Sequence, residues 1–124
     1  MVAKNYCALA IDDDELALRF YRDYFTAHEV ELATALTAED GLALMANKAY
    51  NVLILDLRLG PTDGRLILRR VRDEYPDTKV VLVTAHCSPN DEDELLALGA
   101  HTVLRKPCTM RAVFESVTKA AMLS

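Results

Sequence analysis

The chain has 124 residues, of which 52% are apolar and 27% are charged, and its formal net charge is −5. This length suffices for a sizeable core, and we expect a single domain over residues 1–124. The acidic balance argues against direct nucleic-acid binding, and no apolar run approaches the roughly 18 residues of a membrane helix. The beginning of the chain has no signal-peptide pattern, and the cysteines are odd in number. We therefore expect a cytoplasmic protein with reduced thiols and no membrane contact.

Strand and helix patterns alternate along the chain. Short apolar runs, typical of buried parallel strands, predict strands over residues 6–11, 30–36, 52–56, 79–84 and 102–106. Apolar residues at helical spacing predict helices from Glu15 to Ala27, from Thr37 to about Asn47, between Gly64 and Pro76, from Ser88 to Gly99 and after Thr109. Five such strand–helix units indicate a doubly wound α/β domain with helices on both faces of the sheet.

Helix termini carry recognisable signals. Thr37 with Asp40 three residues later is a variant of the capping box, and Ser88 precedes a proline at the first helical position. The acidic run 91–94 is interpreted as favourable charge at a helix N-terminus rather than as a metal site. Gly99 is typical of a helix end.

Polar side chains follow four of the predicted strands. Residues 12–14 are three aspartates after the first strand, Asp56 ends the third, Thr84 ends the fourth and Lys106 ends the fifth. Ligands of open parallel sheets bind outside the carboxyl ends of the strands, so these residues predict one site. Each has a simpler explanation alone: Asp14 is as well suited to capping the first helix as to binding a ligand. The conjunction of complementary groups carries the prediction.

The chemistry of these groups suits a phosphoryl group and a divalent cation. The carboxylates of Asp12, Asp13 and Asp56 repel one another unless a cation lies between them. Mg²⁺ takes oxygen ligands and keeps positions for water and phosphate oxygens. Lys106 can pair with a carboxylate or phosphate, and Thr84 can hydrogen-bond a phosphoryl oxygen. An aspartate can also act as a nucleophile that forms an acyl phosphate.

With these motifs the whole chain resembles the receiver domain of bacterial two-component response regulators. The resemblance implies a flavodoxin-like (βα)5 fold with strand order 2-1-3-4-5. It implies that Asp56 is the phosphoacceptor and that Thr84 and Lys106 engage the phosphoryl group. Asp12 and Asp13 resemble the acidic pair that holds Mg²⁺, with Asp13 and the main-chain carbonyl of Arg58 as ligands.

The resemblance also implies a function as a switch rather than as an enzyme, with at most slow self-catalysed phosphorylation and dephosphorylation. A sensor histidine kinase or phosphotransfer protein would phosphorylate Asp56 with Mg²⁺. The output face would comprise the fourth helix, fifth strand and fifth helix, about residues 89–122, and would contact an output domain, a downstream protein or a second copy of the chain. Arg58 and His86 lie at family positions that flank the path of the attacking water, so we expect them to tune the lifetime of the phosphoryl group.

Three positions depart from the family pattern. Val103 stands where many receivers carry an aromatic residue that swings inward on activation. The loop proline, usually four residues after the phosphoacceptor, is displaced to Pro61 by Gly60. Cys108 replaces the large apolar residue usual after the Lys-Pro pair. Cys87 and Cys108 follow two strands that are adjacent in the expected sheet, so the two thiols are candidates for close approach.

Other classes of protein share parts of this pattern. A phosphohydrolase of the haloacid dehalogenase type uses an Asp-x-Asp motif after its first strand, which Asp12 and Asp14 match in spacing, but it gives Asp56 no role. A flavodoxin-like FMN carrier needs hydroxyl and N–H groups where this chain has three aspartates. A degenerate receiver that acts only as an interaction module is the remaining alternative.

Overall fold

The computed structural model describes residues 6–85 and 87–123. Five parallel strands form the central sheet: β1 (Cys7–Ile11), β2 (Glu31–Ala35), β3 (Val52–Leu55), β6 (Lys79–Thr84) and β7 (Thr102–Arg105). Their order is β2-β1-β3-β6-β7. Since β6 and β7 are the fourth and fifth strands of this sheet, the predicted doubly wound, flavodoxin-like order 2-1-3-4-5 is confirmed.

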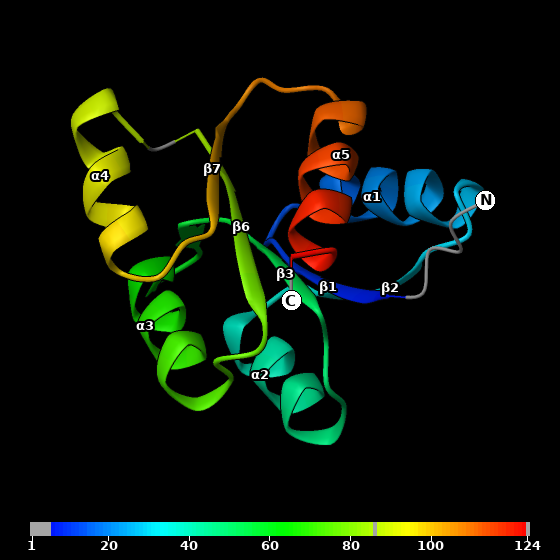
Figure 1. Cartoon of the computed structure of the whole chain (residues 1–124), viewed down its shortest axis with the longest axis horizontal. Coiled ribbons are helices and arrows are strands. Elements are labelled where there is room, and N and C mark those ends of the chain that lie inside the picture. Colours follow the sequence, from blue (N-terminus) through cyan, green and yellow to red (C-terminus); the bar gives the residue numbers. More distant parts are fainter. Residues whose placement is uncertain (1–5, 86, 124) are drawn as a thin grey trace.

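The helices lie on both faces of the sheet, with α1 and α5 on one face and α2, α3 and α4 on the other (Figure 1). Their bounds are α1 (Glu15–Ala27), α2 (Ala38–Asn47), α3 (Gly64–Glu74), α4 (Pro89–Ala97) and α5 (Met110–Ala121). The five predicted helices and the five predicted strands of the central sheet are all present in the predicted order. The strands predicted to end at Asp56 and Lys106 end one residue earlier, because these polar residues open loops, and the strand predicted over residues 30–36 is one residue shorter at each end.

Alternation along the buried strands divides the core into two clusters. On β1, Leu9 and Ile11 pack in the cluster with α2, α3 and α4, whereas Ala8 and Ala10 pack with α1 and α5. Side chains of a strand point alternately to opposite faces, so an uninterrupted apolar run fits a strand covered on both sides. Because the strand interiors are apolar on both faces, polar groups lie at the carboxyl ends of β1, β3 and β6.

The helix caps follow the sequence signals. Asp14 accepts hydrogen bonds from the amides of Leu16 and Ala17 at the start of α1. Thr37 accepts one from the Asp40 amide, and the Asp91 carboxylate accepts two from Ser88, one from its amide and one from its hydroxyl. These two bonds hold the pKa of Asp91 below its usual value. The acidic start of α4 is thus a helix cap.

The connection between β3 and α3 contains a feature that the sequence did not predict. It forms an antiparallel hairpin of two short strands, β4 (Arg58–Leu59) and β5 (Thr62–Asp63), each two residues long. Gly60 at its tip has φ +61° and is followed by a proline, whose φ is negative. A positive φ followed by a negative one is the pattern of a type II′ turn, the turn that suits tight hairpins.

Within the described part of the chain, no helix combines the length and apolar character needed to span a membrane.

Candidate functional site

The sheet register brings the polar strand ends together. Ile11 pairs with Leu55, and Leu55 pairs with Leu82, so β1, β3 and β6 end near the same level. Asp12 and Asp56 follow directly and are 3% and 8% exposed, and Thr84 at the end of β6 is fully buried. The predicted grouping at the carboxyl edge of the sheet is therefore present.

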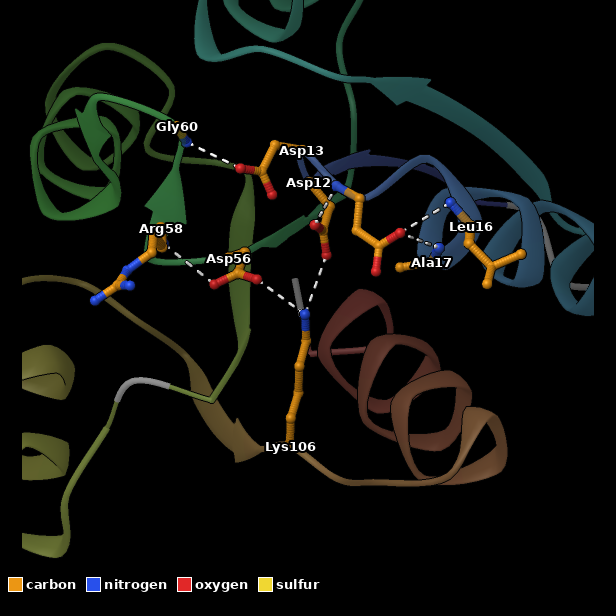
Figure 2. Close-up of polar contacts among 9 residues, drawn as sticks. Asp12, Asp13, Leu16, Ala17, Asp56, Arg58, Gly60 and Lys106 are labelled. Carbon is orange, nitrogen blue, oxygen red and sulfur yellow. Dashed lines mark hydrogen bonds and ion pairs between the residues drawn. The ribbon is translucent and has the colours of Figure 1, made fainter.

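Lys106 lies between two of the carboxylates (Figure 2). Its Nζ is 2.9 Å from Asp56 Oδ2 and 3.3 Å from Asp12 Oδ2. Burial opposes the charged ammonium, but the hydrogen bond to Asp56 and the charges of both aspartates outweigh it and raise the pKa of Lys106. The ammonium is therefore a fixed positive charge beside the Asp56 carboxylate over the physiological pH range.

Each of the three predicted site carboxylates also accepts a main-chain N–H. Asp12 Oδ1 accepts from the Asp14 amide at 3.0 Å, and Asp56 Oδ1 accepts from the Arg58 amide at 3.1 Å. Asp13 Oδ2 accepts from the Gly60 amide at 3.0 Å. These donors orient the carboxylates without adding mobile side chains. Burial nevertheless raises the pKa of Asp12, the main-chain bond and Lys106 offsetting it only in part.

The loop after Asp56 is fixed by Gly64. The Gly64 amide donates to the Leu57 carbonyl at 2.7 Å. A Cβ at Gly64 would lie 2.6 Å from Leu57 Cα and 2.7 Å from the Asp56 carbonyl oxygen, closer than real Cβ contacts. Asp63 caps α3 through the Arg65 amide. The start of α3 is therefore held directly against the main chain of Asp56 and Leu57.

The donor set suits a hard cation, although the side chains do not converge on one point. Among residues 6–85 and 87–123 no group of three or more histidine, cysteine, aspartate or glutamate side chains is placed to hold a metal ion. Lys106 occupies the space between Asp12 and Asp56, and Asp13 is bonded to the hairpin. Mg²⁺ typically takes only one or two carboxylates, with waters completing its octahedron. The oxygen donors present therefore fit Mg²⁺ in kind.

The remaining predicted residues fall in different places. The side chain of Arg58 is exposed, and its main chain bonds the Asp56 carboxylate. His86 lies outside the described residues. Asp14, for which sequence reasoning left two roles open, is the cap of α1. Sequence reasoning missed the Gly60 amide and the close approach at Gly64.

The cysteines are unpaired and partly buried. Cys87 packs against the cluster that holds α2, α3 and α4, whereas Cys108 packs against the cluster that holds α1 and α5. The two side chains therefore pack toward opposite faces of the sheet, which does not support the hypothesis that Cys87 and Cys108 approach one another.

Together, the strand order and the carboxylate–lysine grouping define a flavodoxin-like α/β protein with an acidic site at the carboxyl edge of its sheet. The model of the response regulator receiver domain matches residues 8–118. This chain belongs to the response regulator receiver domain family.

Similar proteins agree with this assignment. The alginate biosynthesis transcriptional regulatory protein AlgB of Pseudomonas aeruginosa is 34% identical over 101 residues, which are 82% of this chain and 22% of that protein. The regulatory protein LuxO of Vibrio cholerae is 30% identical over 98 residues, 79% of this chain and again 22% of that protein. The chain thus spans about a fifth of the length of these relatives.

Solved structures give the same fold. A CheY-like response regulator receiver domain protein from Methanospirillum hungatei superposes with a TM-score of 0.89 at 25% identity, covering 95% of this chain and 94% of that one. The receiver domain of a LuxO repressor protein from Vibrio parahaemolyticus superposes with a TM-score of 0.87 at 25% identity, covering 95% and 93%.

Proposed function

We propose that the domain is a phosphorylation-dependent switch in which Asp56 accepts a phosphoryl group from a histidine kinase or phosphotransfer protein. The observation that carries the proposal is the pairing of a buried strand-end carboxylate, Asp56, with the Lys106 ammonium 2.9 Å away. Receiver domains are phosphoacceptor signalling domains, and this pairing puts a nucleophile and a fixed cation at one point. The arrangement supports phosphoryl capture by Asp56.

In the proposed step an Asp56 carboxylate oxygen attacks the phosphorus atom of a phosphohistidine. The new P–O bond forms as the P–N bond breaks, and the imidazole leaves with the electron pair and takes a proton. Lys106 remains charged throughout and pairs with a phosphoryl oxygen, and the Thr84 hydroxyl donates to another. Charge on the transferring group is thereby stabilised by groups already in place.

Receiver domains typically bind Mg²⁺ at this position, and we assign its binding to Asp13, Asp12, Asp56 and the Arg58 carbonyl. When bound, the ion neutralises negative charge on the carboxylates and on the incoming phosphoryl oxygens. The protein's own contribution is to hold the carboxylates oriented by main-chain N–H groups before the donor arrives. Such preorganisation spares reorganisation at the moment of transfer.

The phosphodonor partner would reach the site across the start of α1. Leu16 and Phe20 are more than half exposed on this helix. They border an apolar groove of about 320 Å³ that also includes Lys106, Cys108 and Met110. Exposed apolar groups beside a reactive centre suit a protein partner better than a small solute. We therefore expect Phe20→Ser to slow transfer from a protein donor while leaving phosphorylation by a small phosphodonor unchanged.

The direct test is intact mass measurement after incubation with Mg²⁺ and a small acyl-phosphate donor. The wild-type protein is expected to gain one phosphoryl group, and Asp56→Asn none. Asp14→Asn is the matched control, because asparagine caps a helix as well as aspartate does, and it should still gain one group. Failure of the wild-type protein to gain mass, or equal gain by Asp56→Asn, would refute the proposal.

Equal gain by Asp56→Asn would favour a phosphohydrolase of the haloacid dehalogenase type. In such an enzyme Asp12 and Asp14 would be the catalytic pair. Here, however, one Asp14 carboxylate oxygen accepts both main-chain hydrogen bonds at the start of α1, so Asp14 serves as a helix cap.

For the lifetime of the phosphoryl group, we propose that Arg58 and His86 influence access of water. Unchanged decay in both Arg58→Ala and His86→Ala would refute that role.

A further inference from the structure

The Asp13 carboxylate is held by a residue on a distant loop. Its Oδ2 accepts the Gly60 amide at 3.0 Å, across 47 positions of sequence. This is a main-chain donor on the β4–β5 hairpin, not a side chain that can rotate away. In Figure 2 the other carboxylate oxygen of Asp13 faces the side of the site on which Asp12 and Asp56 lie.

The hairpin conformation makes this donor available. Gly60 has φ +61°, which glycine adopts without strain. The β4–β5 ladder pairs Leu59 with Thr62 and leaves the two tip residues outside it. The Gly60 N–H is therefore directed at Asp13 rather than used within the hairpin. Pro61 next to it has no N–H at all, so the order Gly-Pro, and not Pro-Gly, puts the donor at position 60.

We propose that the Gly60 N–H is a positioning group that orients Asp13 as a ligand for the divalent cation. The inference rests on the proposed Mg²⁺ site. Carboxylates that bind metals are commonly hydrogen-bonded by outer partners, and loss of such a partner typically weakens metal affinity about 10–100-fold. The chain's Gly-Pro hairpin tip supplies this partner from the loop that follows the phosphoacceptor.

The test exchanges two neighbouring residues. The double variant Gly60→Pro with Pro61→Gly keeps the composition, removes the N–H at position 60 and introduces one at position 61. Because proline fixes φ near about −65°, it also converts the tip to a type II turn, the turn that Pro-Gly favours. Gly60→Ala is the matched control. It keeps the N–H, and its Cβ meets no atom within 4 Å, so it adds only the strain of a positive φ. Mg²⁺ dissociation constants are measured by titration calorimetry for all three proteins.

The exchange variant is expected to bind Mg²⁺ about 10–100-fold more weakly than the wild-type protein, and Gly60→Ala within about threefold of it. Equal affinities of the wild-type and exchange proteins would overturn the role of Gly60. Equal weakening in Gly60→Ala and in the exchange variant would overturn it too, since turn strain rather than the N–H would then be responsible.

A spectroscopic readout separates orientation of Asp13 from general damage to the hairpin. The Gly60 amide proton resonance should move upfield in Asp13→Ala and should shift during Mg²⁺ titration with the calorimetric dissociation constant. A resonance insensitive to Asp13→Ala would contradict the hydrogen bond. Absence of any Mg²⁺ binding by the wild-type protein would instead overturn the proposed metal site itself.

Discussion

Replacing the Lys106 ammonium should expose how strongly the two buried carboxylates depend on it. In Lys106→Met the side-chain length is kept, so packing along the apolar groove is retained, but Asp12 and Asp56 lose their common partner. A hydrogen bond to a charged group contributes about 1.5–3 kcal/mol. We assign about 2 kcal/mol to the 2.9 Å bond to Asp56. The 3.3 Å bond to Asp12 is longer, so we assign it about 1 kcal/mol, less than the usual range.

The net loss is smaller than this sum. Lys106 is 29% exposed, and removing its charge recovers about 1 kcal/mol of desolvation, leaving a loss of about 2 kcal/mol in the free energy of unfolding. With an unfolding entropy of about 2.1 cal/mol/K per residue, this corresponds to a drop of about 8 °C in Tm. Lys119→Met, at an exposed position on α5, should change stability by less than about 0.5 kcal/mol.

The loss should depend on pH and on Mg²⁺. Burial already raises the pKa of Asp12, and without the ammonium it rises further. A carboxylate whose pKa is higher in the folded than in the unfolded state binds its proton more tightly when the protein is folded. This stabilisation of the fold is complete below the unfolded pKa of about 3.9 and is lost as pH rises through the folded pKa. The defect of Lys106→Met should therefore shrink from pH 7 toward pH 4.5, and shrink at pH 7 when Mg²⁺ is added.

Urea unfolding followed by far-ultraviolet circular dichroism measures these differences at both pH values, with a chelator or with Mg²⁺. A loss below about 0.5 kcal/mol at pH 7 would mean that water already solvates the two carboxylates. An equal loss at both pH values would show that the repulsion between them is not the cause.

Three further changes test other parts of the structure. Gly64→Ala forces a Cβ onto Leu57 main-chain atoms at 2.6 Å and should cost about 2–4 kcal/mol in a urea titration; a near-neutral result would contradict the close packing. The ion pair of Arg65 with Glu94 joins exposed side chains, so a double-mutant cycle should give a coupling of at most about 1 kcal/mol. Burial raises the pKa of the Cys108 thiol, so mass-mapped alkylation at pH 8 should be slower there than for a cysteine in an unstructured peptide; faster labelling would refute it.

The fold was predictable because its signals are local and periodic. Apolar runs bounded by polar residues mark strands that are covered on both faces, and Thr37 or Ser88 mark helix starts by chemistry that needs only three or four neighbouring residues. The grouping of Asp12, Asp56 and Lys106 was predictable for a related reason. Parallel strands share one carboxyl edge, so residues at the strand ends meet without any knowledge of side-chain packing.

The features that sequence reasoning missed depend on contacts between distant loops. Two-residue strands have no periodicity to detect, so the β4–β5 hairpin gave no signal. The bond from Gly60 to Asp13 uses a main-chain N–H, which every residue except proline carries. The sequence left open whether Cys87 and Cys108 meet, because adjacency of two strands does not say toward which face each following loop turns.

The contacts that could carry a signal from Asp56 to the output face can be compared by the free energy that each contributes. Val103 on β7 packs against the same cluster as Leu95 of α4 and has no ring to swing. The hairpin offers another connection, because Arg65 at the start of α3 pairs with Glu94 of α4. An exposed pair contributes at most about 1 kcal/mol, whereas moving a two-state equilibrium from 1:99 to 99:1 needs about 5.5 kcal/mol. In the proposed switch the larger share must therefore come from buried groups at the strand ends, and Thr84, which is fully buried at the end of β6, is such a group.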